Sequence, residues 1–206
     1  MTLRASSWLF ALCLCVEVAM PASSNAEDSK EIDQALLHPL FEDDFACAQH
    51  WEGQLEYPGD ALGSDCWVTR LIETPSGGSF SRSFLGEGLR NEDWFSWGAA
   101  VLAPFDGRVS RIHVNPVVNE PGQLGKPPAS MILFEGEGGL RALFAHVADI
   151  AVAVGDEVVA GQKVAVVGNN GFGRNPHIHV GAWRGREALQ IRFDLRAQGA
   201  QRSTDE

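Results

Sequence analysis

The chain of 206 residues has little positive charge, and it lacks a long apolar run. No stretch reaches the roughly 18 uninterrupted apolar residues that a transmembrane helix needs. Lysine and arginine total 16 against 27 acidic residues, which gives a net charge of -11, and the basic residues form no cluster. We therefore expect no nucleic acid partner and no tight binding to anionic lipid.

Residues 1–26 have the features of a secretory signal peptide. Arg4 precedes a short apolar run, and the small residues Ser24 and Ala26 flank Asn25. We expect cleavage after Ala26 and no membrane insertion once the signal is removed. The mature protein is therefore expected to be secreted or periplasmic.

Cysteine is scarce, with four residues in the whole chain. Cys13 and Cys15 fall in the expected signal peptide, so the mature chain keeps only Cys47 and Cys66. In an oxidising compartment two remaining cysteines are expected to form one disulfide, with a stabilisation of about 3 kcal/mol. A cysteine-based metal site is disfavoured because neither residue has CxxC or CxH spacing.

The rest of the chain divides by composition. Residues 27–45 are polar and acidic, which favours a linker or pro-segment, and residues 201–206 are expected to be a C-terminal tail. Residues 46–200 contain short β-type runs separated by glycine, proline and asparagine, with no long amphipathic helix, and so predict one all-β domain. The runs are 67–73, 99–114, 129–136, 141–147, 150–168, 177–183 and 189–195.

Two of these runs contain a turn signal between two apolar stretches. Residues 103–109 predict a strand, a turn in which Gly107 can take a positive φ, and a second strand. Residues 154–168 predict a second unit of this kind. We expect the two units to build halves of a compact antiparallel β core.

A pair of histidines follows a glycine-rich turn. His177 and His179 are two residues apart, so in an extended strand both side chains project to the same face. Alone, this pattern is more often a solvated strand face than a site. A third histidine, His146, lies upstream and adds weight to a functional interpretation.

Several segments resemble, in order and spacing, the core of the LytM-type, lysostaphin-like zinc metallopeptidases of family M23. They are FAHV at 144–147, GDEVVAGQ at 155–162, GNNG at 168–171 and PHIH at 176–179, with WGAAVLAPFDGRV at 97–109 upstream. The resemblance implies an all-β, LytM-like fold (a duplicated hybrid motif) with an antiparallel β-sheet core and a loop-rich N-terminal extension. It also implies a Zn²⁺-dependent endopeptidase acting on the peptide cross-links of peptidoglycan.

The resemblance implies roles for three residues. His179 matches a zinc ligand, whereas His146 and His177 match the catalytic histidines that orient and deprotonate the attacking water. Zinc acts as a Lewis acid on the scissile carbonyl, and a neutral imidazole can accept a proton at physiological pH.

The chain departs from the family at the other two ligands, which an H-x-x-x-D element normally supplies. Leu89 falls near the expected histidine position. Asp93 is the best match for the aspartate ligand, with Glu92 as the alternative, and Asn91 has only an amide oxygen to offer. His50, close to Cys47, is our candidate for the remaining ligand, although it also fits a hydrogen-bonding residue of a loop.

Two other functions remain open. A LytM-like domain that has lost its catalytic site could act as a binding module that regulates a cell-wall hydrolase, and the missing histidine favours this. Residues 154–167 also resemble the hairpin of biotinyl and lipoyl carrier domains, but Lys163 lies inside the second strand rather than at the hairpin tip. The aromatic residues Trp94, Phe95 and Trp97, and Trp183 downstream, fit either a binding groove or the core.

Overall fold

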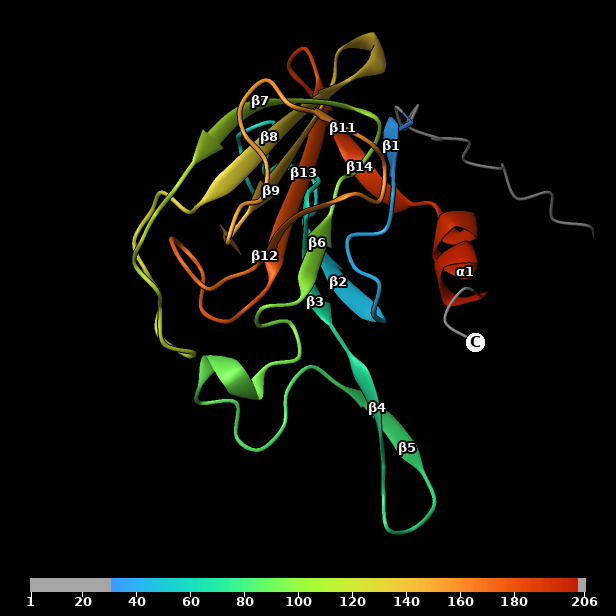
Figure 1. The fold of residues 1–206 in the computed structure, drawn as a ribbon, viewed down its shortest axis with the longest axis vertical. Helices are drawn as coiled ribbons and strands as arrows, with labels where there is room; N and C mark the ends of the chain where they lie inside the picture. The colour runs from blue at the N-terminus through green and yellow to red at the C-terminus, as the bar shows by residue number, and fades with distance from the viewer. Residues whose placement is uncertain (1–30, 204–206) are drawn as a thin grey trace, which may run out of the picture. The chain divides into compact units, whose positions relative to one another are not determined.

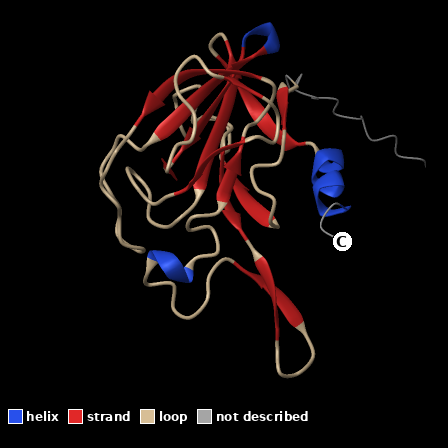
Figure 2. Ribbon diagram, viewed as in Figure 1, coloured by secondary structure: helices blue, strands red, loops and turns tan. Residues whose placement is uncertain are grey.

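Strands account for most of the regular structure in the computed structural model, which describes residues 31–203 (Figure 1; Figure 2). Helical structure in this range comprises α1 (Leu195–Ser203) and two 3-10 turns, η1 (Asn91–Asp93) and η2 (Glu137–Gly139). The all-β prediction is therefore confirmed. None of the helices in residues 31–203 is long and apolar enough to cross a membrane. The expected signal peptide and residues 204–206 lie outside the described residues.

A nine-stranded sheet forms the body of the fold. Seven strands lie side by side in the order β1 (Gln34–Leu37), β14 (Glu187–Phe193), β13 (Ile178–Arg184), β9 (Leu140–Ala145), β8 (Met131–Gly136), β7 (Gly107–His113) and β11 (Glu157–Val158). The hairpin of β2 (Phe45–Gln49) and β3 (Ser64–Val68) joins this sheet where β3 pairs with the first residues of β13. All pairs are antiparallel except β1 with β14, which is parallel.

Two smaller sheets accompany the main one. The first has the order β10 (Val147–Ala148), β12 (Lys163–Val167) and β6 (Ala100–Leu102). The second is a two-stranded ribbon of β4 (Arg70–Glu73) and β5 (Ser79–Arg82), which extends away from the main sheet (Figure 1).

The two turn units expected from the sequence do not form separate hairpins. β6 pairs with β12 and β7 pairs with β11, so each unit pairs with the other rather than with itself. The reason for Gly107 also differs from the prediction, because a Cβ atom there would lie 2.4 Å from the carbonyl oxygen of Glu135. Glycine is required by the close approach of β8, not by a positive φ.

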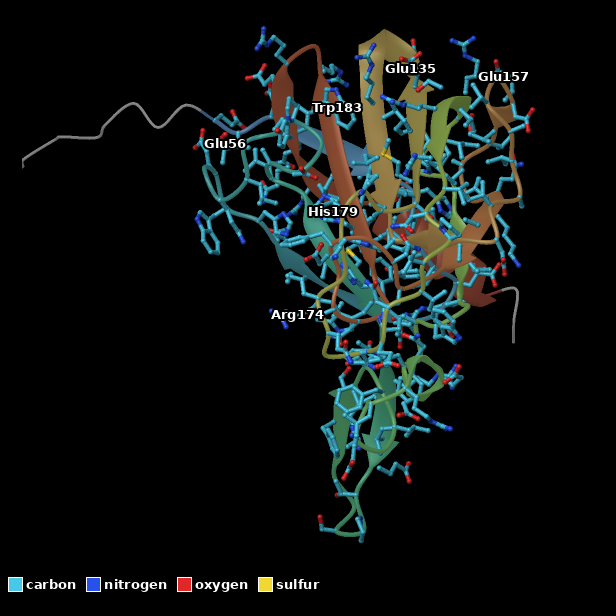
Figure 3. The ribbon with its side chains drawn as sticks, turned by 90° about the vertical axis from the view of Figure 1, so that its left-hand side faces the viewer. Glu56, Glu135, Glu157, Arg174, His179 and Trp183 are labelled. Atoms are coloured by element: carbon cyan, nitrogen blue, oxygen red, sulfur yellow. A yellow bond between two sulfur atoms is a disulfide. The ribbon has the colours of Figure 1, made fainter. Side chains whose placement is uncertain are left out.

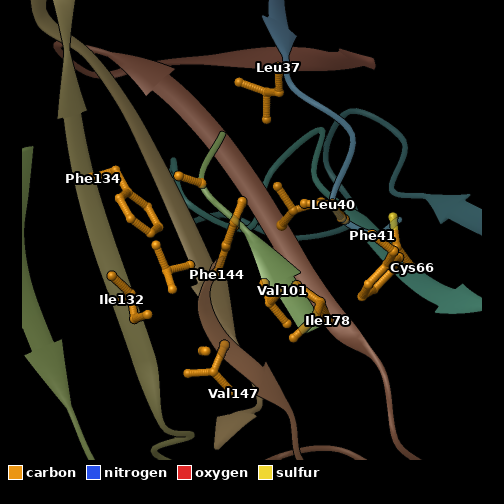
Figure 4. Close-up of a cluster of buried hydrophobic side chains, with 14 of the residues drawn as sticks. Leu37, Leu40, Phe41, Cys66, Val101, Ile132, Phe134, Phe144, Val147 and Ile178 are labelled. Carbon is orange, nitrogen blue, oxygen red and sulfur yellow. The ribbon is translucent and has the colours of Figure 1, made fainter. Parts of the chain in front are cut away.

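The core lies between the main sheet and the β10–β12–β6 sheet (Figure 4). Alternate residues of β8 and β9 point into it, for example Ile132, Phe134 and Phe144, which are fully buried. Val101 of β6 and Ile178 of β13 face the same cluster. Burial of each such side chain contributes about 1.5–3 kcal/mol, so this cluster fixes β13 firmly beneath the site described below.

The expected linker over residues 27–45 needs correction in its second half. β1 adds to the main sheet beside β14, and Leu37, Leu40 and Phe41 are buried in the core (Figure 4). The acidic residues dominate the composition here, but the few apolar residues between them bury completely. The C-terminal boundary also shifts, because α1 continues to Ser203 and so includes the start of the expected tail.

The expected disulfide is present and links directly opposed residues of β2 and β3, Cys47 and Cys66. Replacing both by alanine removes a cross-link that closes a loop of 19 residues. We expect the free energy of unfolding to fall by about 3 kcal/mol, measured by denaturant unfolding. Reduction of the disulfide in the wild-type protein should lower the free energy of unfolding by the same amount. A decrease below about 1 kcal/mol would contradict this prediction.

Candidate metal and catalytic site

The strand β13 sets the position of the site. His179 is directly opposite Asp65 of β3 on one side and Ala145 of β9 on the other. His146 follows Ala145, and His177 immediately precedes β13. The register of three neighbouring strands thus brings distant residues around one point, and Figure 3 shows His179 on β13 with Trp183 farther along the strand.

Three side chains form a group able to hold a metal ion: His50, Asp65 and His179. One ligand atom from each lies within 4.8 Å of the others, and this is the only such group among residues 31–203. Nδ1 of His179 is 2.9 Å and Nε2 of His50 is 3.5 Å from the Asp65 carboxylate. Two imidazoles and one carboxylate make up a ligand set of the kind that binds catalytic zinc and leaves a fourth position open.

The remaining nitrogen of each ligand histidine is also engaged. Nδ1 of His50 donates to the backbone oxygen of Asp60 at 3.1 Å. Nε2 of His179 lies 3.2 Å from the Asp60 carboxylate. Each ring is thereby held with its free nitrogen toward Asp65, which is the orientation that metal-binding histidines require. The residues present therefore fit a zinc ion.

The structure brings together His50 and His179 as the sequence predicts, but Asp93 lies elsewhere. The Asp93 carboxylate accepts a hydrogen bond from the backbone N–H of Arg90 at 3.0 Å and ends η1. Asp65 occupies the aspartate position of the group instead.

Asp65 was missed because the family pattern places both ligands in one short H-x-x-x-D element. Here His50 and Asp65 are separated by a loop, residues 51–63, and meet across the β2–β3 hairpin. The sequence did carry a signal, since Asp65 adjoins Cys66 just as His50 follows closely on Cys47. A disulfide between the two cysteines therefore brings His50 and Asp65 close to each other.

His146 and His177 lie beside the metal-binding group as a pair. Their ring centroids are 4.4 Å apart. Nδ1 of His146 donates to the Asn170 carbonyl and Nδ1 of His177 to the Asn175 carbonyl, each at 2.7 Å. Both rings therefore have an unprotonated Nε2, and that of His177 is 3.7 Å from the Asp65 carboxylate.

The backbone at His146 adopts a conformation that is uncommon for a residue with a side chain. Its φ is 66°, in the left-handed region, and its carbonyl accepts a hydrogen bond from Gly168. Such strained residues persist only where their surroundings hold them in place, and they are frequent at active sites. The turn out of β9 thus directs the His146 ring toward His177.

Burial and charge separate the protonation states of the site. Burial and the neighbouring His177 lower the pKa of His146 to about 3, and burial also lowers the pKa of His177. Burial disfavours charge on His179 as well, but the carboxylates of Asp60 and Asp65 outweigh it and raise the pKa of His179 to about 9. Burial raises the pKa of Asp65, yet the hydrogen bond with His179 and nearby histidines lower it well below its usual range.

These shifts distinguish His146 and His177 from His179. His146 and His177 are neutral near pH 7 and can act as proton acceptors. His179 carries a proton that a metal ion must displace.

All five site residues, His50, Asp65, His146, His177 and His179, line one pocket of ≈ 540 Å³. The pocket walls include Leu55, Pro128 and Leu143. A second pocket of ≈ 280 Å³ adjoins it and shares Asp65, Phe172 and His177. Together they offer an extended cleft that passes over the metal-binding group.

The aromatic residues expected at a groove divide between groove and core. Trp94 lines the smaller pocket together with Trp67. Phe95 packs against the hydrophobic core. Trp183 lies next to Gly59, where an added Cβ would approach its ring to 3.2 Å. The sequence alone could not separate these roles.

Comparison with known proteins finds a family model that matches part of the chain. Residues 93–191 match the model of peptidase family M23. No curated protein matches the chain.

Three solved structures are similar to the chain. The first is a mutant catalytic domain of the prophage-encoded M23 protein EnpA from Enterococcus faecalis, with 20% sequence identity, 74% of this chain and 92% of that chain covered, and a TM-score of 0.46. The second is the catalytic domain of the antimicrobial peptidase lysostaphin from Staphylococcus simulans, with 17% identity, 71% and 87% of the two chains covered, and a TM-score of 0.43. The third is a chain of the SpoIIIAH–SpoIIQ complex, with 13% identity, 74% and 95% of the two chains covered, and a TM-score of 0.48.

The family match includes His146, His177 and His179, whereas His50 and Asp65 lie upstream of it. The predicted resemblance is confirmed: residues 93–191 of the chain match peptidase family M23.

Proposed function

We propose that the protein is an exported, zinc-dependent endopeptidase that hydrolyses peptide cross-links of bacterial peptidoglycan. The observation that carries the proposal is that the group His50, Asp65 and His179 lines the same pocket as the pair His146 and His177. The match of residues 93–191 to peptidase family M23 supports the peptide cross-link as substrate.

The site residues account for the steps of amide hydrolysis. A zinc ion held by His50, Asp65 and His179 would supply Lewis acidity toward the scissile carbonyl and the attacking water. His146 and His177 hold their Nδ1 protons against backbone carbonyls, so their Nε2 atoms can take a proton from that water and pass it to the leaving amine. The adjoining pocket, with Trp67 and Trp94, can hold the peptide on one side of the scissile bond.

Export is part of this proposal. The features of a signal peptide in residues 1–26 and a disulfide between Cys47 and Cys66 both suit a periplasmic or secreted protein. The acidic composition without a basic cluster supports a partner other than nucleic acid.

The alternative is a binding module without catalysis. Its support was the absence of a histidine near Leu89. A second histidine and an aspartate reach His179 from the β2–β3 hairpin, so that support is removed. The retained pair His146 and His177 also suits hydrolysis, since a surface that only binds has no use for two oriented, neutral imidazoles.

Hydrolysis of purified peptidoglycan tests the proposal. Protein lacking residues 1–26 is stripped of metal, reloaded with zinc, and incubated with sacculi. We expect soluble peptides to appear, identified by mass spectrometry, only with the zinc-loaded protein. Zinc-loaded protein that binds sacculi but releases nothing would contradict the endopeptidase and favour the binding module.

A further inference from the structure

The loop of residues 51–63, which separates His50 from Asp65, lies directly on β13. An added Cβ at Gly181 would come within 1.7 Å of the Gly59 oxygen, and one at Gly63 within 2.7 Å of the Val180 oxygen. Only glycine at these points allows the two backbones to approach so closely. The end of the loop is therefore fixed against the strand that carries His179.

Asp60, in this part of the loop, contacts both ligand histidines. Its carboxylate lies 3.2 Å from Nε2 of His179, and its backbone oxygen accepts from Nδ1 of His50 at 3.1 Å. The loop closes on itself here, because the N–H of Asp60 donates to the Tyr57 oxygen and the N–H of Gly63 donates to the Asp60 oxygen. Asp60 thus engages the outward-facing nitrogen of each ring, and the adjacent Gly59 backbone oxygen lies 3.3 Å from the same nitrogen of His179.

These contacts determine which nitrogen of each ring can bind metal. An imidazole that donates a proton from one nitrogen has its lone pair on the other. Asp60 therefore leaves Nε2 of His50 and Nδ1 of His179 as lone pairs, and these are the atoms that face Asp65. The Asp60 carboxylate itself faces the Nε2 side of the His179 ring, away from the ligand atom Nδ1.

We propose that Asp60 is a positioning residue for the metal site, which fixes the orientation and tautomer of both histidine ligands from a single turn of the inserted loop. This rests on the proposed function only in that the site binds zinc. In a short H-x-x-x-D element the two ligands are held together by their closeness in the chain. Here His50 and Asp65 are far apart in the chain, and the contacts of the loop hold them in place.

Zinc affinity, measured by competition with a chromophoric chelator, tests this role. Asp60→Ala removes the carboxylate but keeps the backbone oxygen, so we expect zinc affinity to fall 10–100-fold, the usual effect of losing such a partner. Asp60→Asn keeps an oxygen acceptor without the charge, so its zinc affinity should lie between those of Asp60→Ala and the wild-type protein. The control is Glu56→Gln on the same loop, because Glu56 is exposed and lies away from His179 (Figure 3).

A second readout separates positioning from general loss of structure. In the zinc-loaded protein, the Nε2 proton of His179 should give a hydrogen-bonded signal in ¹⁵N-resolved NMR, which Asp60→Ala shifts or abolishes while the backbone amide signals of β9 remain. Unchanged zinc affinity and an unchanged His179 signal in Asp60→Ala would overturn the inference. If the unchanged protein itself fails to bind zinc, the proposed function fails first.

Discussion

Asp65→Asn is expected to abolish tight zinc binding and peptidoglycan hydrolysis, whereas Asp93→Asn leaves both in place. Asp65 lies 2.9 Å from Nδ1 of His179 and 3.5 Å from Nε2 of His50, so its carboxylate is the common partner of both ligand rings. Burial raises the pKa of Asp65, but the hydrogen bond with His179 and the neighbouring histidines outweigh this effect and keep the carboxylate ionised. Asparagine preserves the shape but not the charge.

The expected loss of zinc affinity is large for Asp65→Asn and small for Asp93→Asn. Loss of a ligand should reduce zinc affinity by at least about 100-fold, more than the loss of an outer partner. Asp93 lies in η1 and contacts Arg90 instead, an exposed arginine, so its replacement should cost less than about 1 kcal/mol of stability. Zinc content by mass spectrometry and peptide release measure the two effects. An Asp93→Asn protein without zinc would return the ligand role to that residue.

His177→Ala is expected to reduce turnover about 10²–10⁴-fold while the protein still binds zinc. The ring of His177 lies 4.4 Å from that of His146, and its Nε2 is 3.7 Å from the Asp65 carboxylate, farther than the two ligand nitrogens of His179 and His50. Because His177 is absent from the metal-binding group, its removal takes away proton transfer and leaves the three ligands.

Two further variants test whether His177 and His146 act together. His146→Ala should cause a similar loss, and the double variant should lose little more than either single one, because residues that act as a unit are not additive. The control is His113→Ala at the end of β7, outside the cleft. Retained hydrolysis in His177→Ala would remove the catalytic role of the pair, whereas loss of zinc in that protein would assign His177 to the metal instead.

Much of the fold could be predicted because its strands are short apolar runs between turn residues. Each of the seven runs overlaps at least one strand of the structure. The pairing of these strands could not be predicted from local patterns, since β6 with β12 and β7 with β11 are contacts between distant residues. The burial of Leu37, Leu40 and Phe41 was hidden by the acidic residues around them.

The site was predictable to the extent that its residues share a local motif. His177 and His179 lie at the start of β13, one just before the strand and one within it, and the segment around His146 resembles a family segment. Asp65 and Asp60 have no such motif, because their roles depend on the β2–β3 hairpin and on the fold of the loop between His50 and Asp65. The predicted pairing of Cys47 with Cys66 was the one sequence feature that linked the strand that precedes His50 to the strand of Asp65.

The burial of Leu37, Leu40 and Phe41 has a bearing on how the protein tolerates trimming. These side chains fill the interior from a stretch that precedes the family match, and β1 covers the open edge of β14. A fragment cut to residues 93–191 would expose that edge and leave a void where three large side chains belong. Proteolytic loss of the chain before β2 would therefore unfold the protein rather than release it from inhibition.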